Sequence, residues 1–302
     1  MKAAPLHLLG LEDFPVGAAS AIFAEAALYK RERGRPGHPR PLEGQTWALI
    51  FSKPSTRTRV SFAVGIRELG GNPLFLSAQD MQMGRGEPIK DTARVLGRML
   101  HGLIVRTFAQ DDLVELAKWS GLPVVNALTD QEHPCQVLTD IFTYQEKRGS
   151  IVGKKVAYIG DANNNMARSY VHAAKYFNFN LWLAAPEGYQ CNVSNDHVTM
   201  VDSPEEAARN ADLLTTDVWV SMGMEEEAAL REKVFAGYQI NREMLRQAHP
   251  DAMVLHCLPA YRGKEISEEV LEERAPDIFD QAENRVHCQK GVLHWLVHER
   301  LK

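Results

Sequence analysis

One short polar stretch of the sequence carries a dense set of groups that bind anions. Residues 51–59 read FSKPSTRTR, with one lysine, two arginines and hydroxyl side chains close together. The apolar run 47–51 before it predicts a buried strand, and residues 60–69 after it predict a helix. A helix N-terminus presents unpaired backbone N–H groups, and guanidinium groups bind phosphate oxygens in pairs. We therefore interpret this turn as a receptor for a phosphate. The alternative is a capped helix with solvated arginines, which does not require so many cations and hydroxyls in one turn.

The length and composition of the chain narrow the class of protein. Its 302 residues suffice for two domains, and 45% hydrophobic with 24% charged residues is typical of a globular protein. A net charge of −5 provides no basic field for nucleic acid, so the phosphate receptor predicts a small anionic ligand. No apolar run approaches the ~20 residues of a membrane span, and Glu12 and Asp13 come too early for a secretory signal. We expect neither a nucleic-acid nor a membrane partner.

The cysteines favour a reducing compartment. They lie far apart in the sequence, at Cys135, Cys191, Cys257 and Cys288. This is not the paired spacing of a zinc site or of a disulfide framework. We therefore expect a cytoplasmic protein without a metal centre.

Apolar runs and helical patterns alternate along the whole chain. Strands are expected at 46–51, 74–77, 102–106 and 123–127, and helices at 18–30, 60–69, 88–100, 111–119 and 135–147. After a break at Gly149–Gly153, strands are expected near 155–160, 181–185, 212–217 and 252–256, and helices near 166–177, 203–210, 240–247 and 281–301. Such alternation predicts an α/β fold of two domains, each with a mostly parallel sheet flanked by helices. We predict one domain over 1–148, completed by the C-terminal helix 284–302, and another over 149–283.

Polar residues follow the strands of the first domain. Ligands of such sheets bind beyond the carboxyl ends of the strands. Arg106 ends an otherwise apolar strand, where it could bind a ligand or form a salt bridge at the sheet edge. His133 and Gln136 open a helix with Pro134, and their spacing of three places both on one side. An imidazole and a carboxamide together can donate to and accept from a planar carbonyl-amine group, although helix capping is an alternative.

Polar residues also follow the strands of the second domain. Residues 160–166 read GDANNNM, where a dinucleotide fold would place several glycines. We interpret this turn as a contact for a polar ligand, with an Asx-rich helix cap as the alternative, and it argues against NAD. Asp217 begins the stretch DVWVSMG, in which a carboxylate could bind an ammonium group and a loop could close over it, with an ordinary surface loop as the alternative. Cys257 ends another strand beside His256, although a lone cysteine there is more often part of the core. We predict an active site in a cleft between the domains, with a phosphate on one side and an amino-acid-like ligand on the other.

Taken together, these stretches resemble the aspartate/ornithine carbamoyltransferase family. The matching motifs, in chain order, are FSKPSTRTR, QMGRGEPIKDTARVLGRM, HPCQ, GDANNNM, DVWVSMG, HCLPA and AENR. They span residues 51–285, and the motifs SMG and HCLP are similar to those of the ornithine branch. The resemblance implies transfer of a carbamoyl group from carbamoyl phosphate to the side-chain amine of L-ornithine, giving L-citrulline and phosphate. It implies no cofactor.

The resemblance also implies roles for individual residues. Those for carbamoyl phosphate are Ser55, Thr56, Arg57, Thr58, Gln82, Arg106, His133, Gln136, Cys257, Leu258 and Arg285. Those for ornithine are Asn165, Asp217, Ser221 and Met222. The residues expected to act in catalysis are Arg57, Arg106, His133, Gln136, Asp217 and Cys257. Gln82 would reach a neighbouring subunit's site, so the resemblance implies a homotrimer or a multiple of trimers.

Two kinds of alternative function are consistent with parts of this pattern. Within the family, the acceptor could be aspartate, putrescine or an N-acylated ornithine, but Asp217 with the SMG and HCLP motifs favours a free α-ammonium. Outside the enzymes, the chain could be a regulator that binds anions without catalysis. The candidate residues in both domains favour an enzyme.

Overall fold

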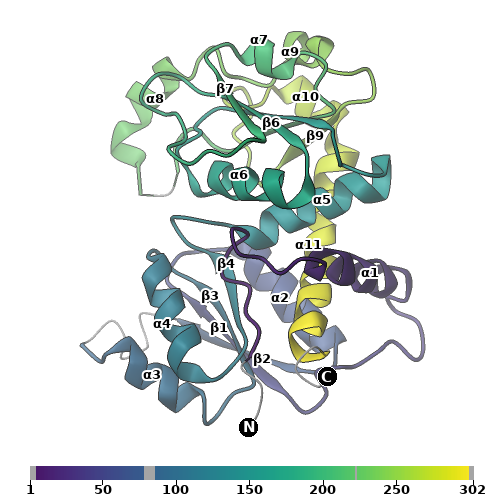
Figure 1. Cartoon of the computed structure of the whole chain (residues 1–302), viewed down its shortest axis with the longest axis vertical. Coiled ribbons are helices and arrows are strands. Elements are labelled where there is room, and N and C mark those ends of the chain that lie inside the picture. Colours follow the sequence, from purple (N-terminus) through teal and green to yellow (C-terminus); the bar gives the residue numbers. More distant parts are fainter. Residues whose placement is uncertain (1–4, 78–85, 222, 299–302) are drawn as a thin grey trace. The chain divides into compact units, whose positions relative to one another are not determined.

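A computed structural model describes residues 5–77, 86–221 and 223–298. The chain divides into two compact units, Met1–Thr139 with Glu283–Lys302, and Asp140–Ala282. Each unit contains one parallel sheet flanked by helices, as the sequence predicts (Figure 1). Two helices, α5 (Pro134–Arg148) and α11 (Ala275–His298), contribute residues to both units.

The first unit is built on a sheet with the strand order β2-β1-β3-β4. Its strands are β1 (Thr46–Phe51), β2 (Asn72–Ser77), β3 (Gly102–Arg106) and β4 (Val124–Leu128). Its other helices are α1 (Ala18–Arg31), α2 (Thr56–Glu68), α3 (Ile89–Leu96) and α4 (Gln110–Ser120). Side chains alternate across a strand, so Ala48 and Ile50 pack with residues of α3 and α4. Trp47 and Leu49 are also buried and alternate with these residues, so they point to the opposite face of the sheet. Helices α1, α2 and α11 lie on that side (Figure 1).

The second unit is built on a sheet with the strand order β7-β6-β5-β8-β9. Its strands are β5 (Lys155–Ile159), β6 (Asn180–Ala184), β7 (Val198–Val201), β8 (Leu213–Thr216) and β9 (Met253–His256). Its helices include α6 (Asn165–Phe177), α7 (Pro204–Ala208), η2 (Glu225–Glu227), α8 (Ala228–Val234), α9 (Arg242–Gln247) and α10 (Glu268–Glu273). One face of the sheet, with Ala157 and Ile159, packs against α7, α9 and α10. Among the residues that the structure describes, no helix is long and apolar enough to cross a bilayer.

Several elements differ from the sequence prediction. Helix α2 begins at Thr56, not at residue 60, because Ser55 caps it. Helix α3 ends at Leu96, before Gly97, whereas the prediction extended it to residue 100. The last helix begins at Ala275, not at residue 281. Strand β7 and helices α8 and α10 were not predicted. All three are short, and β7 is only partly buried.

The N-terminal segment docks on the edge of the first sheet. Leu8 forms a parallel bridge with Val125, in which Leu8 N donates to Val124 O and Asn126 N donates to Leu8 O. The side chains of Gln110 and Asn126 both donate to Leu9 O, at 2.9 and 2.8 Å. The segment is thereby fixed to β4, the strand that leads toward His133.

Glu132 connects this segment to the turn before His133. Its side chain is buried, and its Oε2 accepts from Leu11 N at 2.9 Å. On the turn itself, the Glu132 N–H donates to Thr129 Oγ1 at 3.1 Å and Thr129 N donates to Glu132 O. Burial raises the pKa of Glu132 from 4.5 to about 7, and the charges of Glu12 and Asp13 add to the rise while the bond from Leu11 N opposes it.

The raised pKa of Glu132 predicts a specific dependence of stability on pH. Between pH 4.5 and about 7 the folded protein keeps a proton that the unfolded chain has lost, so stability falls as pH rises through this window. The loss reaches about 3 kcal/mol above the window, at ~1.4 kcal/mol for each pKa unit. Glu132→Gln cannot ionise and can still accept from Leu11 N. We expect its unfolding free energy, measured in urea by tryptophan fluorescence, to gain on the wild type from about pH 4.5 to about pH 7 and to keep a constant lead above that. The exposed Glu226→Gln is the control, and parallel curves for Glu132→Gln and wild type would refute the assignment.

Candidate active site

The strand order of each sheet brings the candidate residues of that unit to one place. In the first sheet the chain winds from β1 outward to β2, then returns to place β3 on the other side of β1. In the second it winds from β5 through β6 to β7, then returns to place β8 beside β5. Ligands of open α/β sheets bind at such reversals of winding, beyond the carboxyl ends of the strands. The candidate residues follow β1, β3 and β4 in one unit and β5, β8 and β9 in the other.

Strand register sets Arg106 beside the turn after β1. Phe51 pairs with Arg106, and Ser52 N donates to Arg106 O at 2.8 Å. The register with β4 shifts between Val105 and Arg106, and such irregularities redirect a side chain. At the carboxyl ends of β1 and β3, Arg106 therefore lies next to the phosphate-receptor turn.

The phosphate-receptor turn forms the start of α2. Ser55 is the N-cap, and its Oγ accepts from Thr58 N at 3.3 Å. Thr56 and Arg57 lie exposed in the first helical turn, whereas Thr58 is buried. The helix begins four residues earlier than predicted, so these side chains surround its N-terminus, where the helix dipole attracts an anion.

A buried group of polar residues lies below this turn. It draws on α2, β3, the turn after β4, α5 and α11, and its members are Thr58, Arg106, His133, Gln136 and Arg285. Arg285 donates to Gln136 Oε1, and to Thr58 Oγ1 at 3.2 Å. The sequence motif AENR therefore lies against HPCQ and STRTR, far apart in the chain. Side-chain bonds of this kind hold donors in place before a ligand arrives.

The imidazole of His133 is neutral in this setting. Burial lowers its pKa well below the ordinary value, and the charges of Arg285 and Arg106 lower it further. A neutral imidazole donates from one nitrogen and accepts at the other, which suits a carbonyl-amine group. Cys135, two residues on, plays no such part: burial raises its thiol pKa to about 12, and its Sγ donates to Asn126 O at 3.3 Å.

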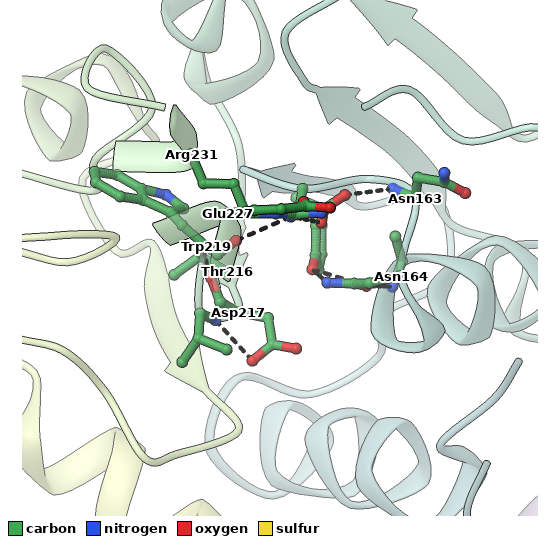
Figure 2. Close-up of polar contacts among 11 residues, drawn as sticks. Asn163, Asn164, Thr216, Asp217, Trp219, Glu227 and Arg231 are labelled. Atoms are coloured by element: carbon green, nitrogen blue, oxygen red, sulfur yellow. Dashed lines mark hydrogen bonds and ion pairs between the residues drawn. The ribbon is translucent and has the colours of Figure 1, made fainter. Parts of the chain in front are cut away.

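Asp217 follows β8 in the second unit. Its Oδ1 accepts from Val218 N at 2.8 Å (Figure 2). The same oxygen accepts from Cys257 Sγ at 3.0 Å. Burial raises the pKa of Asp217, and the bond from Cys257 is the largest effect that opposes the rise. β8 pairs with β9 so that Thr216 lies opposite His256, which explains how Cys257 reaches this carboxylate. The cysteine is thus a partner of the anion.

The next residue, Leu258, adopts a left-handed backbone with φ of 56°. Leu258 N donates to His256 Nδ1 at 2.8 Å, and His256 Nε2 lies 3.2 Å from Glu265 Oε1. Because Nδ1 accepts, Nε2 carries the hydrogen that Glu265 accepts. Both members of this pair are fully buried, and together they fix the chain around Cys257.

In the asparagine turn after β5, neighbouring residues have different roles. Asn164 caps α6, and its side chain accepts from Ala167 N at 2.9 Å. Asp161 accepts from Asn163 N at 2.9 Å in an Asx turn before the helix, so the capping alternative holds for Asn164. Asn165 is the first residue of α6 and is partly buried, as is Ser221 after β8. Gln82 and Met222, also predicted as ligand residues, lie outside the described residues.

Three further features were missed by the sequence analysis. They are the contact of Arg285 with Thr58, the buried Glu132, and an ion pair between Asp161 and Arg231. Asp161 stands within a noted motif, but nothing in the sequence marks Arg231 as its partner. The expected cleft between the domains stays a prediction.

Comparison with known proteins identifies both halves of the chain. Residues 6–146 match the family model of the carbamoyl-P binding domain of aspartate/ornithine carbamoyltransferase. Residues 152–296 match the model of the Asp/Orn binding domain of the same family.

Individual relatives agree along nearly the whole length. The ornithine carbamoyltransferase of Akkermansia muciniphila is 52% identical, over 97% of this chain and 99% of its own. That of Hydrogenovibrio crunogenus is 47% identical, over 96% of this chain and 98% of its own.

Solved structures show the same arrangement of elements. The ornithine carbamoyltransferase from Pyrococcus furiosus has a TM-score of 0.89 at 42% identity, over 97% of each chain. The one from Burkholderia thailandensis has a TM-score of 0.89 at 41% identity, over 97% of this chain and 99% of its own. Two matched domain models in the right order, carried on the two parallel sheets described above, place this chain in the aspartate/ornithine carbamoyltransferase family.

Proposed function

We propose that the protein transfers the carbamoyl group of carbamoyl phosphate to the side-chain amine of L-ornithine, giving L-citrulline and phosphate. The observation that carries the proposal is that positive side chains lie at the strand ends of the first unit and a carboxylate lies at a strand end of the second. The buried guanidinium groups of Arg106 and Arg285 lie in the first unit, most of which falls within the match to the carbamoyl-P model. A partly buried carboxylate, Asp217, lies in the unit that matches the Asp/Orn model. The relatives named ornithine carbamoyltransferase support the choice of acceptor.

Carbamoyl phosphate is assigned to the first set of residues. Its phosphate binds at the N-terminus of α2 through Ser55, Thr56, Arg57 and Thr58. Arg106 contacts both the phosphate and the carbonyl oxygen, and His133 and Gln136 hold the carbamoyl group. Arg285 contributes from α11, while Cys257 and Leu258 line the ligand. The capped start of α2 and the bonds of Arg285 to Gln136 and Thr58 support this assignment.

Ornithine is assigned to the second set of residues. Asp217 binds the α-ammonium group, and Asn165, Ser221 and Met222 complete the contacts. A carboxylate held by two donors presents its remaining lone pairs in a fixed direction, which favours an ammonium partner. It also disfavours aspartate, which would bring carboxylates near it, and an N-acylated ornithine, whose α-nitrogen carries no charge. Putrescine keeps a second ammonium and differs from ornithine in lacking the carboxylate, so the acceptor assay below decides between these two.

The reaction begins with attack of the neutral side-chain amine on the carbonyl carbon. An alkylammonium has a pKa near ~10.4, and the positive field of Arg57 and Arg106 favours its neutral form. As the nitrogen–carbon bond forms, Arg106, His133 and Thr58 donate to the oxyanion that develops on the carbonyl oxygen. The neutral state of His133 suits this role, because it donates a hydrogen bond without a proton transfer.

The tetrahedral intermediate collapses by breaking the carbon–oxygen bond to phosphate. The departing phosphate accepts the proton that the amine nitrogen loses, so no protein base is needed. Holding the two substrates close together, with the amine directed at the carbonyl carbon, supplies much of the remaining rate enhancement.

The cellular setting follows from the same assignment. Citrulline formation belongs to arginine biosynthesis, or in reverse to arginine breakdown, and we place it in the cytoplasm. We assign residues 1–148 with 284–302 to carbamoyl phosphate and 149–283 to ornithine. Active sites are shared between the protomers of a homotrimer, and Gln82 of each protomer reaches into the active site of its neighbour.

Loss of either arginine tests the carbamoyl phosphate assignment. We expect Arg57→Ala to raise the KM for carbamoyl phosphate at least ~tenfold, because a charge-assisted pair is lost. Arg106→Ala removes a donor to the oxyanion and should lower kcat by ~10²–10³. Steady-state assays of citrulline formation measure both, and Arg67→Ala, an exposed arginine at the other end of α2, is the matched control. Wild-type constants in both variants would overturn the assignment.

Asp217→Asn tests the ornithine assignment. The substitution keeps the shape and one acceptor oxygen but removes the charge that an α-ammonium needs. We expect the KM for ornithine to rise ~10- to 100-fold, the range for a charged hydrogen bond, with the KM for carbamoyl phosphate close to wild type. Equal damage to both substrates would show that Asp217 supports the fold. Assays of the wild type with aspartate, putrescine and N-acetylornithine as acceptors complete the test.

A further inference from the structure

A buried ion pair joins two of the segments that carry the ornithine residues. Arg231 Nη1 lies 2.7 Å from Asp161 Oδ2, and the two side chains are only 7% and 4% exposed. Asp161 belongs to the turn after β5 that leads into Asn165. Arg231 comes from α8, which follows the loop after β8. Neither residue has a role in the transfer described above.

The same guanidinium group holds the start of the loop after β8. Arg231 Nη1 donates to Trp219 O at 3.0 Å, two residues beyond Asp217 and two before Ser221. Figure 2 shows Arg231 among Trp219, Glu227 and the turn that carries Asn163. One side chain therefore fixes the turn after β5 and the loop after β8 to each other.

Aromatic packing holds the arginine itself in place. The Trp219 ring stacks on Phe235 with centroids 6.0 Å apart and an interplanar angle of 18°. The guanidinium group of Arg231 lies over the Tyr189 ring, 5.0 Å from its centroid. Tyr189 O in turn accepts from Ala162 N, in the same turn as Asp161. The network thus closes on itself around Arg231.

A buried ion pair is a weak source of stability, because removing two charges from water offsets most of their attraction. An apolar pair of the same size would fill this space at lower cost. The ion pair does supply directional bonds from one planar group to Asp161 and Trp219, which apolar residues cannot provide. The ion pair is therefore suited to fixing the position of the turn after β5 relative to the loop after β8.

We propose that Arg231 is a positioning residue for ornithine, which acts through Asp161 and the Trp219 carbonyl to set the spacing between Asn165, Asp217 and Ser221. This inference rests on the proposed function. It assigns to α8 a part in acceptor recognition, although its side chain touches no substrate. Contacts of ornithine would be weakened together if this spacing relaxed, whereas the residues for carbamoyl phosphate lie on other elements.

The test compares the two Michaelis constants in variants of the full-length enzyme. In Arg231→Met we expect the KM for ornithine to rise ~10- to 100-fold, the range for losing one hydrogen bond to a charged group of the substrate. The KM for carbamoyl phosphate should stay within about twofold of wild type. Arg231→Lys keeps the charge but not the planar fork, so it should restore part of the affinity for ornithine. Asp161→Asn should shift the same constant in the same direction by a smaller factor.

Controls separate positioning from folding. A residue that served only the fold would reduce the active fraction, and hence kcat, without changing either KM of the molecules that remain folded. Arg262→Met, which removes exposed ion pairs with Glu268 and Glu272 in the same unit, should leave both constants unchanged. The double variant Asp161→Asn, Arg231→Met should bind ornithine no worse than Arg231→Met alone, because the residues act as one unit.

The outcomes distinguish this inference from the proposed function. If the wild type forms no citrulline from ornithine, both fall. If the wild type is active and ornithine's KM is unchanged in Arg231→Lys and Asp161→Asn, only the positioning role falls, even if Arg231→Met fails to fold. A rise in both Michaelis constants by the same factor would also overturn it.

Discussion

The site depends on one constraint of parallel sheets, which is that all carboxyl ends open on the same edge. Where the winding reverses, the segments after two neighbouring strands depart in opposite directions and leave space between them. This happens between β1 and β3 in one unit and between β5 and β8 in the other. The ends of apolar strands thereby carry groups that would be costly elsewhere in a core. Arg106 illustrates this, because it closes a strand whose other residues are fully buried.

The first unit must hold buried cations before any substrate arrives. Burying Arg106 and Arg285 near the same imidazole, that of His133, costs desolvation and repulsion. The same charges that lower the pKa of His133 would attract a dianionic ester, so the unfavourable field of the empty protein becomes favourable on binding. The bonds of Arg285 to Gln136 and Thr58 keep the donors directed in the meantime. Preorganisation of this kind is the usual source of transition-state stabilisation in acyl transfer.

Most of the fold could be predicted from local sequence, and the exceptions have physical causes. Strands β1 and β3 match the expected ranges because both are continuous apolar runs bounded by polar residues. Strand β7 was not predicted because it lies at a sheet edge, where partial burial leaves no strong hydrophobic pattern in the sequence. Helix α2 starts early because Ser55 caps it, and a polar first turn hides that start from a search for apolar periodicity. Helix α10 is short and largely charged, so its two buried residues give little periodicity.

The residues of the site divide in the same way, by how far apart their partners lie in the chain. Arg57, His133 and Asp217 were identifiable because each stands in a dense motif next to a predicted strand. Their supports were not, because Leu11 meets Glu132 across 121 residues, and Asp161 meets Arg231 across 70. A single sequence carries no local trace of such pairs, since Glu132, Asp161 and Arg231 each resemble a solvated surface charge and any backbone N–H can be a donor. The proposed positioning role of Arg231 would make acceptor affinity depend on a residue that lies outside every motif of the sequence.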